Sequence, residues 1–311
     1  MSANTVTTLR VVCRLATVAA VLTLITGCDA KQPPQTFASP EEAAAALVTA
    51  AENFDGAALR KILGSDGAAL VGSPDSVSDR NDAKAFAAEA RSKQRIDYDS
   101  AKTTAVIVVG NGEWPVPFPI VRRDGGWAFD AATGREEVLQ RRIGRNELDA
   151  IDACRGYVEA QKEYALVKHD GAMVNQYAQR VISTPGKQDG LAWQAADGSW
   201  QGPLGHGVAR LIAEGYKDRY EAFHGYYFKI LKGQGPAAPM GQMDFLVGGA
   251  MIGGFALVAA PAEYLVTGVK TFIVSHDGIV YEKDLGDQTF EQFQKMERYN
   301  PDSTWKPVAD N

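Results

Sequence analysis

The chain has 311 residues, of which 45% are hydrophobic, 23% charged and 9% aromatic. These values are typical of a globular protein and exclude a disordered chain, a collagen-like fibre and a disulfide-dense miniprotein. The 32 basic and 38 acidic residues leave a formal net charge of -6, and no block of Lys or Arg stands out. We therefore expect no nucleic-acid partner. The length suggests about two domains.

Residues 1–27 have the pattern of a lipoprotein signal peptide. Arg10 and Arg14 give a positive start, and the uncharged run from Leu15 to Ile25 is mostly apolar. That run is too short to cross a bilayer, which needs about 20 residues. The letters Leu-Ile-Thr-Gly then precede Cys28, a string similar to the bacterial lipobox.

A lipobox predicts that the Cys28 thiol takes a diacylglycerol and that the freed amine takes a further acyl chain such as palmitate. We therefore expect a cell-envelope protein that faces the periplasm and has the membrane as a partner. Asp29 resembles the inner-membrane retention signal of enteric bacteria and favours that membrane. The alternative is an ordinary secretory signal followed by an unrelated cysteine. Residues 28–39 are interpreted as a polar, Pro-containing tether.

An N-terminal α+β domain is predicted over residues 40–143. Ser39 is a natural N-cap and Glu42 completes a capping box with it, so a first helix should run on to Ala51. Two more helices are expected, one from Asp55 to Gly64 and one over 83–91 opened by Asp79 or Asn81. Helices followed by strands indicate the α+β class.

An antiparallel meander should follow these helices. Residues 103–109 are rich in β-branched types and lead to an Asn-Gly dipeptide at 111–112, which is typical of a hairpin turn. Residues 114–121 carry a proline at every second position, and each proline removes a ladder donor. This strand is therefore expected at a sheet edge. A turn at 124–126 leads to a last strand over 127–130.

A C-terminal domain of a helix and an antiparallel sheet is predicted over residues 144–311. A long helix should run from Arg135 to about Val167, with the domain boundary near Gly144. Its core-facing side is expected to carry Leu148, Ile151, Cys154, Val158 and Ala165, with Gln161 as the polar exception. After a loop-rich segment we expect a helix over 208–223, strands over 226–231, 254–260 and 269–275, a turn at 277–278, a strand over 279–281 and a surface strap over 301–311.

The uncharged run of 18 residues from Phe245 to Ala262 has the length of a membrane span. It contains four glycines and a proline, which suit a backbone bend. We interpret it as a glycine-rich bend that leads into a buried strand.

Several long strings resemble the bacterial domain of unknown function 2950 family: His224 to Leu231, Gln234 to Pro236, Met251 to Ala259 and Phe272 to Gly278. The resemblance covers most of the mature chain. It implies a secreted or lipid-anchored protein and supplies no catalytic residue, since the family has no established activity.

Two further resemblances concern fold. The C-terminal half is similar to a type IV pilin headgroup through the strings 160–165, 225–228, 259–261 and 268–279. This implies a fold and not pilus assembly, because a lipobox stands where a pilin has an apolar helix. Residues 40–130 resemble the cone domains of nuclear-transport-factor-2-like proteins through the order of their elements.

No catalytic residue, metal site or cofactor is expected from the motifs. The histidines at 169, 206, 224 and 276 are not spaced as helical metal ligands, and no cysteine pair accompanies them, so turn or surface positions are expected. His276-Asp277 could form a catalytic dyad, but Asp-Gly at 277–278 favours a hairpin turn. Cys154 lies on an apolar helix face, where a thiol is inert.

Four aromatic residues are the binding candidates. Trp193 and Trp200 fall in a loop-rich region and could stack on a glycan or a protein partner, or simply anchor the loop. Trp127 and Phe129 would form part of the wall if residues 40–130 enclosed a cone-shaped cavity.

The sequence predicts a lipid-anchored cell-envelope protein that acts as a non-catalytic binding or assembly module. One alternative is a small-ligand-binding cone domain. Another is an envelope hydrolase, which would need two carboxylates, or a histidine and a carboxylate, to converge in a cleft.

Overall fold

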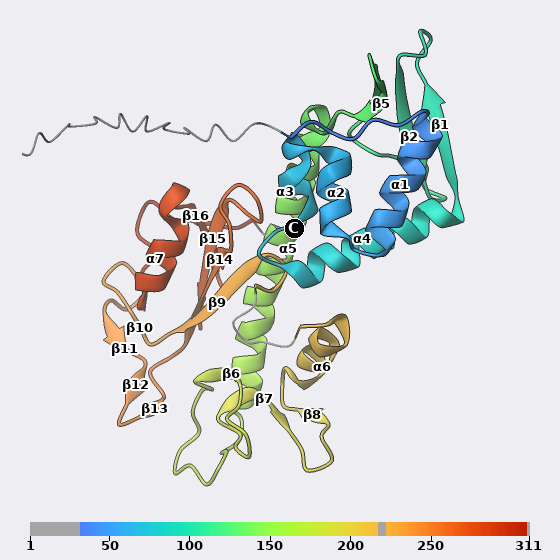
Figure 1. The fold of residues 1–311 in the computed structure, drawn as a ribbon. Helices are drawn as coiled ribbons and strands as arrows, with labels where there is room; N and C mark the ends of the chain where they lie inside the picture. The colour runs from blue at the N-terminus through green and yellow to red at the C-terminus, as the bar shows by residue number, and fades with distance from the viewer. Residues whose placement is uncertain (1–31, 217–221, 310–311) are drawn as a thin grey trace, which may run out of the picture. The chain divides into compact units, whose positions relative to one another are not determined.

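The computed structural model describes residues 32–216 and 222–309. Its mixed α+β architecture confirms the predicted class, with N-terminal helices, antiparallel sheets, one long helix and a C-terminal antiparallel sheet (Figure 1). The predicted leader and Cys28 lie outside the described residues. Among the helices of the described ranges, none has both the length and the apolar character that crossing a membrane requires.

The first two helices begin where their caps predicted. In α1 (Pro40–Glu52), the Ser39 hydroxyl accepts from the Glu42 amide at 3.2 Å. The Glu42 carboxylate accepts from the amide of Ala38, one residue before the cap, so the capping box is displaced by one position. In α2 (Gly56–Leu63), the Asp55 carboxylate accepts from the amides of Ala57 and Ala58, and Gly64 ends the helix with φ 70°.

The third predicted helix begins earlier than expected. A short α3 (Ala68–Val71) precedes α4 (Ser76–Ser92), whose N-cap is Asp75 and not Asp79 or Asn81. The Asp79 carboxylate instead accepts from the Ser73 amide, which closes the loop before the helix. Helices α1 and α4 pack side by side (Figure 1).

The first sheet has the order β1-β2-β4-β5, with β3 also paired to β2. Its strands are β1 (Gln94–Tyr98), β2 (Thr104–Val109), β3 (Trp114–Pro115), β4 (Ile120–Arg123) and β5 (Gly126–Phe129). The predicted strand over 114–121 is thus divided in two, because prolines 115, 117 and 119 cannot donate to a ladder. The predicted position at a sheet edge is correct for β3 and wrong for β4, because β4 lies between β2 and β5.

The long helix α5 (Ala131–Tyr164) starts four residues before the predicted start and ends three before the predicted end. It passes through Gly144, so the predicted domain boundary falls inside a continuous helix. Four of the expected core-facing residues, Ile151, Cys154, Val158 and Gln161, are buried. Leu148 is 57% exposed, so the prediction was wrong there.

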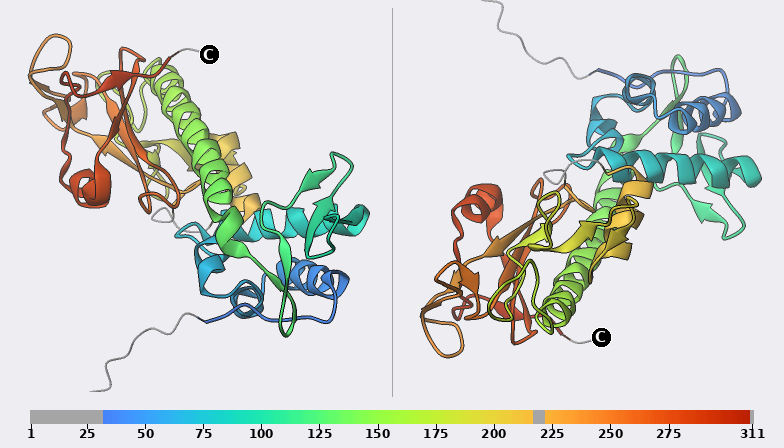
Figure 2. Two further views of the ribbon diagram at one scale, coloured as in Figure 1. Left: turned by 90° about the horizontal axis from the view of Figure 1, so that it is seen from above. Right: turned by 90° about the horizontal axis from the view of Figure 1, so that it is seen from below.

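The C-terminal sheet has the order β18-β16-β15-β14-β9 and is antiparallel throughout. Its strands are β9 (Tyr226–Leu231), β14 (Ala256–Pro261), β15 (Lys270–Ser275), β16 (Val280–Asp284) and β18 (Lys306–Pro307). Helix α5 packs against β14 and β15 (Figure 2), and α7 (Thr289–Lys295) packs against β14. The glycine-rich run forms the hairpin of β12 (Leu246–Val247) and β13 (Ala250–Met251) before the fully buried β14, which confirms the predicted bend and strand.

The remaining elements are short. They are β6 (Arg180–Ile182), β7 (Gly190–Gln194), β8 (Trp200–Gln201), α6 (Gly205–Glu214), β10 (Gly233–Gln234), β11 (Met243–Asp244) and β17 (Arg298–Tyr299). Helix α6 ends at Gly215, which adopts φ 113°, well before the predicted end at Phe223. The left-handed backbone at this glycine is the physical reason for the stop.

The buried apolar side chains form two clusters. One contains residues between Phe37 and Ala131, and the other contains residues between Ala150 and Trp305. Between these clusters, Asp75 of the α4 cap accepts hydrogen bonds from the Tyr216 hydroxyl and the Gly225 amide.

Candidate functional site

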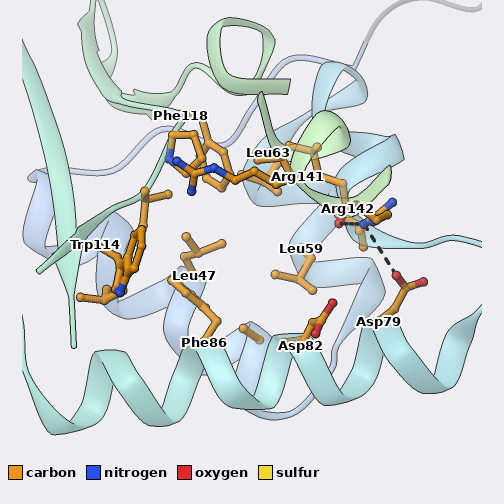
Figure 3. Close-up of a pocket in the computed structure, with 18 of the residues that line it drawn as sticks. Leu47, Leu59, Leu63, Asp79, Asp82, Phe86, Trp114, Phe118, Arg141 and Arg142 are labelled. Atoms are coloured by element: carbon orange, nitrogen blue, oxygen red, sulfur yellow. Dashed lines mark hydrogen bonds and ion pairs between the residues drawn. The ribbon is translucent and has the colours of Figure 1, made fainter. Parts of the chain in front are cut away.

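A cavity of about 480 Å³ opens in the N-terminal part of the chain (Figure 3). Helices α1, α2, α3, α4 and the first half of α5 line it together with the end of β2 and residues 114–118. Pockets that hold small molecules typically measure about 300–1,000 Å³ and are mostly apolar. The apolar lining consists of Leu47, Ala51, Phe54, Leu59, Leu63, Leu70, Val71, Ala83, Phe86, Val109, Trp114, Pro115, Val116, Pro117, Phe118 and Val138.

The prolines of 114–118 explain how this wall forms. Because the chain cannot continue in the ladder after β3, residues 116–119 leave the sheet and pass over the cavity. The Val116 amide still donates to Ile107 at 2.8 Å, which holds the segment against β2. The Phe118 ring packs edge-to-face on Phe129, with ring centroids 5.8 Å apart.

Trp114 is the exposed aromatic residue of the wall. The residue is 65% exposed. The turn approaches the ring closely, since a Cβ at Gly112 would lie 2.4 Å from the indole Nε1. Figure 3 shows the indole at one side of the cavity, across from Arg142 and Asp79. Trp114 therefore offers a stacking surface to a molecule that enters.

The opposite side of the cavity carries charge. The Arg142 guanidinium lies 3.6 Å from the Asp79 carboxylate, and their side chains are only 12% and 7% exposed. Arg142 also donates to the carbonyls of Ala69 and Leu70 at 3.1 and 3.3 Å. Burial raises the pKa of Asp79, while the Ser73 amide and Arg142 act in the opposite direction.

Two more arginines of α5 line the cavity. Arg145 binds Asp82 through both guanidinium nitrogens, at 3.1 and 2.6 Å, in the bidentate geometry that arginine forms with carboxylates. Arg141 pairs with Glu137, one helical turn earlier. Glu137 does not line the cavity. The arrangement can hold an apolar molecule and present it with fixed charges.

The aromatic residues that the sequence predicted for a cavity wall, Trp127 and Phe129, are not among the residues that line this cavity. Both are buried in the N-terminal cluster. Trp127 packs edge-to-face on Tyr98, with centroids 6.0 Å apart. A Pro-rich segment ending a strand, with one exposed tryptophan, is the sequence signal that could have pointed to Trp114 instead.

The other two predicted binding residues lie together on a different part of the chain. Trp193 and Trp200 belong to the β7–β8 ladder, where Gln194 pairs with Trp200 and Trp193 pairs with Gln201. Both side chains are half-buried. The Trp193 ring packs edge-to-face on His169 at 5.6 Å, and its buried Nε1 has no hydrogen-bond partner within the described ranges.

The four histidines are dispersed. His169 is buried and stacks on Tyr164 with centroids 3.9 Å apart. It is not a surface residue, but its carbonyl accepts from the Ala172 amide at 2.9 Å, so it begins a turn as expected. His206 is exposed, and His224 lies at a turn with its Nδ1 2.6 Å from Asp149. His276 precedes the hairpin turn at Gly278, which confirms the turn.

None of the histidines lines the cavity. Over residues 32–216 and 222–309, no group of three or more His, Cys, Asp and Glu side chains is placed to hold a metal ion. Cys154 is fully buried on α5, and burial raises the pKa of its thiol to about 12.

The comparisons with known proteins give one result. Neither a curated protein nor a solved structure matches the chain. One family pattern, described as protein of unknown function (DUF2950), matches residues 34–308 and so covers all the elements that build the cavity. The chain therefore belongs to the DUF2950 family of proteins of unknown function.

Proposed function

We propose that this protein is a binding protein of the cell envelope that takes a small, mainly apolar molecule into the N-terminal cavity. One observation carries the proposal: a cavity of about 480 Å³ has mostly apolar walls supplied by five helices, the end of β2 and the Pro-rich segment. A space of this size that is mainly apolar and carries a small number of placed polar groups is the usual form of a small-molecule site. The proposal follows the alternative of a small-ligand-binding cone domain that the sequence suggested, but the cavity wall does not include Trp127 and Phe129.

The driving force would be removal of apolar surface from water. Transfer of apolar area contributes about 25 cal/mol per Å², so a molecule that contacts Leu47, Leu59 and Phe86 gains affinity without a strong polar contact. Stacking on the Trp114 indole would add to this. Three of the helices that form the cavity, α1, α2 and α4, have side-chain caps that fix their N-terminal ends, which supports a preformed site.

A filled cavity tests the proposal. Ala83 of α4 lines the cavity, and Ala83→Phe should occupy it with a ring. Ala85 is exposed on the same helix and does not line it, so Ala85→Phe is the matched control. The probe is 1-octanol, and binding to the full-length chain is measured by titration calorimetry.

We expect octanol to bind the wild-type chain and the Ala85→Phe variant and not the Ala83→Phe variant. Circular dichroism and the melting temperature would establish that both variants fold. Undiminished binding by a folded Ala83→Phe variant would contradict the proposal, as would the absence of octanol binding to the wild type.

The cell-envelope part of the proposal depends on Cys28. The order of positive start, apolar core and lipobox-like string supports acylation at that residue, and Asp29 favours the inner membrane. Cys28→Ala should leave the protein unacylated and released from the membrane fraction. Persistent membrane attachment of that variant would count against a lipid anchor. The succession of α5 and the antiparallel strands supports the pilin-headgroup resemblance of the C-terminal half as a proposal about fold alone.

A further inference from the structure

We propose that the molecule bound in the cavity carries one anionic group and that Arg141 binds it. This inference rests on the proposed function, because it assigns the chemistry of a ligand at the same site. The observation behind it is the pairing of the charged side chains around the cavity.

Five charged side chains line the cavity: Asp79, Asp82, Arg141, Arg142 and Arg145. Each of the two carboxylates is paired with its own arginine, Asp79 with Arg142 and Asp82 with Arg145. The lining therefore keeps one positive charge that no other lining residue balances. That charge belongs to Arg141.

Arg142 and Arg145 are held in place by their existing bonds. The Arg142 guanidinium is nearly buried. It donates to two backbone carbonyls and forms an ion pair with Asp79. Arg145 donates from two of its guanidinium nitrogens to the two carboxylate oxygens of Asp82. Taking either guanidinium away would leave a carboxylate uncompensated, and for the nearly buried Asp79 this would be costly.

Arg141 differs in its partner and its position. Its side chain is 53% exposed and pairs with Glu137, which is equally exposed and lies outside the cavity. An exposed pair within one helix contributes little to stability, so exchanging Glu137 for a ligand anion has a small cost. In Figure 3 the Arg141 side chain extends along the cavity toward Phe118. Its guanidinium can therefore meet a ligand head group while the ligand body contacts the apolar wall.

The ligand class follows from these two regions. An alkyl chain or ring would contact Leu47, Leu59 and Trp114, and a carboxylate or a phosphate would be bound by the planar guanidinium. A cationic head group on the same body would meet the Arg141 guanidinium and be repelled by it, so it should weaken binding. The site therefore suits an amphiphile with a single acidic head.

The test compares probes that share one chain and differ in the head group. Octanoate, octyl phosphate, 1-octanol and octyltrimethylammonium are titrated into the full-length chain below their micelle-forming concentrations. We expect octanoate or octyl phosphate to bind about five- to tenfold more tightly than octanol, and the ammonium probe to bind more weakly than octanol. The better of the two anions identifies the head group as a carboxylate or a phosphate.

Three variants assign the effect to Arg141. Arg141→Gln should remove the preference for the anion, so that this variant binds the anion and octanol with affinities within about twofold of each other. Glu137→Gln removes the competing carboxylate and should tighten anion binding. Arg135→Gln, at an exposed arginine of the same helix that does not line the cavity, is the control and should change neither affinity.

The outcomes separate the two proposals. If octanol binds and Ala83→Phe blocks it, but the anion gains nothing or Arg141→Gln does not weaken it, the anionic assignment is overturned and the apolar site stands. Tighter binding of the ammonium probe would also overturn it. If neither octanol nor an anion binds the wild-type chain, the proposed function fails, and this inference fails with it.

Discussion

The hydroxyl of Tyr216 donates to both carboxylate oxygens of Asp75, at 3.0 and 2.9 Å, across 141 residues of sequence. Asp75 also caps α4 through the Ser78 amide and accepts from the amide of Gly225 at the start of β9. Asp75 is only 3% exposed, and its carboxylate is the acceptor in each of these hydrogen bonds. One cap residue thus ties the helix that lines the cavity to the C-terminal part of the chain.

Tyr216→Phe should destabilise the protein by about 1–3 kcal/mol, because it removes a hydrogen bond to a buried carboxylate and leaves that carboxylate less satisfied. Chemical denaturation monitored by circular dichroism measures the change. Tyr98→Phe is the control: its hydroxyl bonds to Glu41 at the surface, so its loss should be much smaller. Equal losses in the two variants would contradict this role of Tyr216.

The N-terminal caps show what local sequence can predict. Ser39 and Asp55 were identified because a cap needs only a short polar side chain and free amides within three residues. Asp75 was missed because Asp79 and Asn81 satisfy the same local rule. The choice among them is made by Tyr216 and Gly225, which are distant in sequence.

Gln161 is the polar residue on the buried face of α5. Its side-chain amide donates to the Ala178 carbonyl and accepts from the Ala178 amide, both at 2.8 Å. Gln161→Leu would leave two buried backbone groups unpaired, so we expect a loss of about 2–4 kcal/mol in unfolding free energy. Denaturant unfolding checks this value.

The matched control for that variant is Gln140→Leu on the exposed side of the same helix. Gln140 bonds only to Glu136, one turn earlier. Its replacement should have little effect on stability. A Gln161→Leu variant as stable as Gln140→Leu would show that the buried amide does not hold the 178 segment to α5.

Cys154 should be inert to alkylation in the folded protein. The thiol is fully buried and burial raises its pKa to about 12, so almost no thiolate is present at pH 8. Treatment with iodoacetamide followed by peptide mass spectrometry should find Cys154 unmodified before unfolding and modified after it. Rapid modification of the native protein would mean that α5 separates from the C-terminal sheet.

The cavity could not be predicted from local patterns. Its lining runs from Leu47 to Arg145 and uses helices, a strand and an irregular segment, which only the tertiary fold brings together. Trp127 and Phe129 were predicted as part of the wall because residues 40–130 resemble cone domains. The prolines around Trp114 were interpreted as an edge signal, whereas they also release the segment that covers the cavity.

Apolar spacing in the sequence also failed to predict one strand and the exposure of one helix residue. The strand β1 was not predicted because its residues are polar and mostly exposed, so it carries no alternating apolar pattern. Leu148 fitted the helical spacing of the buried face and is nevertheless exposed. Asn146 and Ala150, on either side of Leu148 in the chain, are buried, so the packing extends past this point of the helix. Each step of three residues falls about 60° short of a full turn, and two such steps place Leu148 off the face that carries Cys154.

Asp79 should make stability depend on pH. Burial raises its folded-state pKa above that of the unfolded chain, so the folded state binds the proton more tightly. Its contribution to stability is therefore largest below the unfolded pKa and is lost as the pH rises through the folded pKa. Asp79→Asn keeps an acceptor for the Ser73 amide and cannot titrate, so the loss on raising the pH from about 4 to about 6 should be smaller than in the wild type.

Urea unfolding of both chains at several pH values measures this difference. Asp82→Asn is the control, because Asp82 is half-exposed and its pair with Arg145 lies in water. Other carboxyls, such as Asp99 and Glu113, have lowered pKa values and change stability in the opposite direction, so each variant is compared with the wild type at the same pH. The stability of Asp79→Asn relative to the wild type should rise with pH over this range, and that of Asp82→Asn should rise less. A constant difference between Asp79→Asn and the wild type would contradict this role of Asp79.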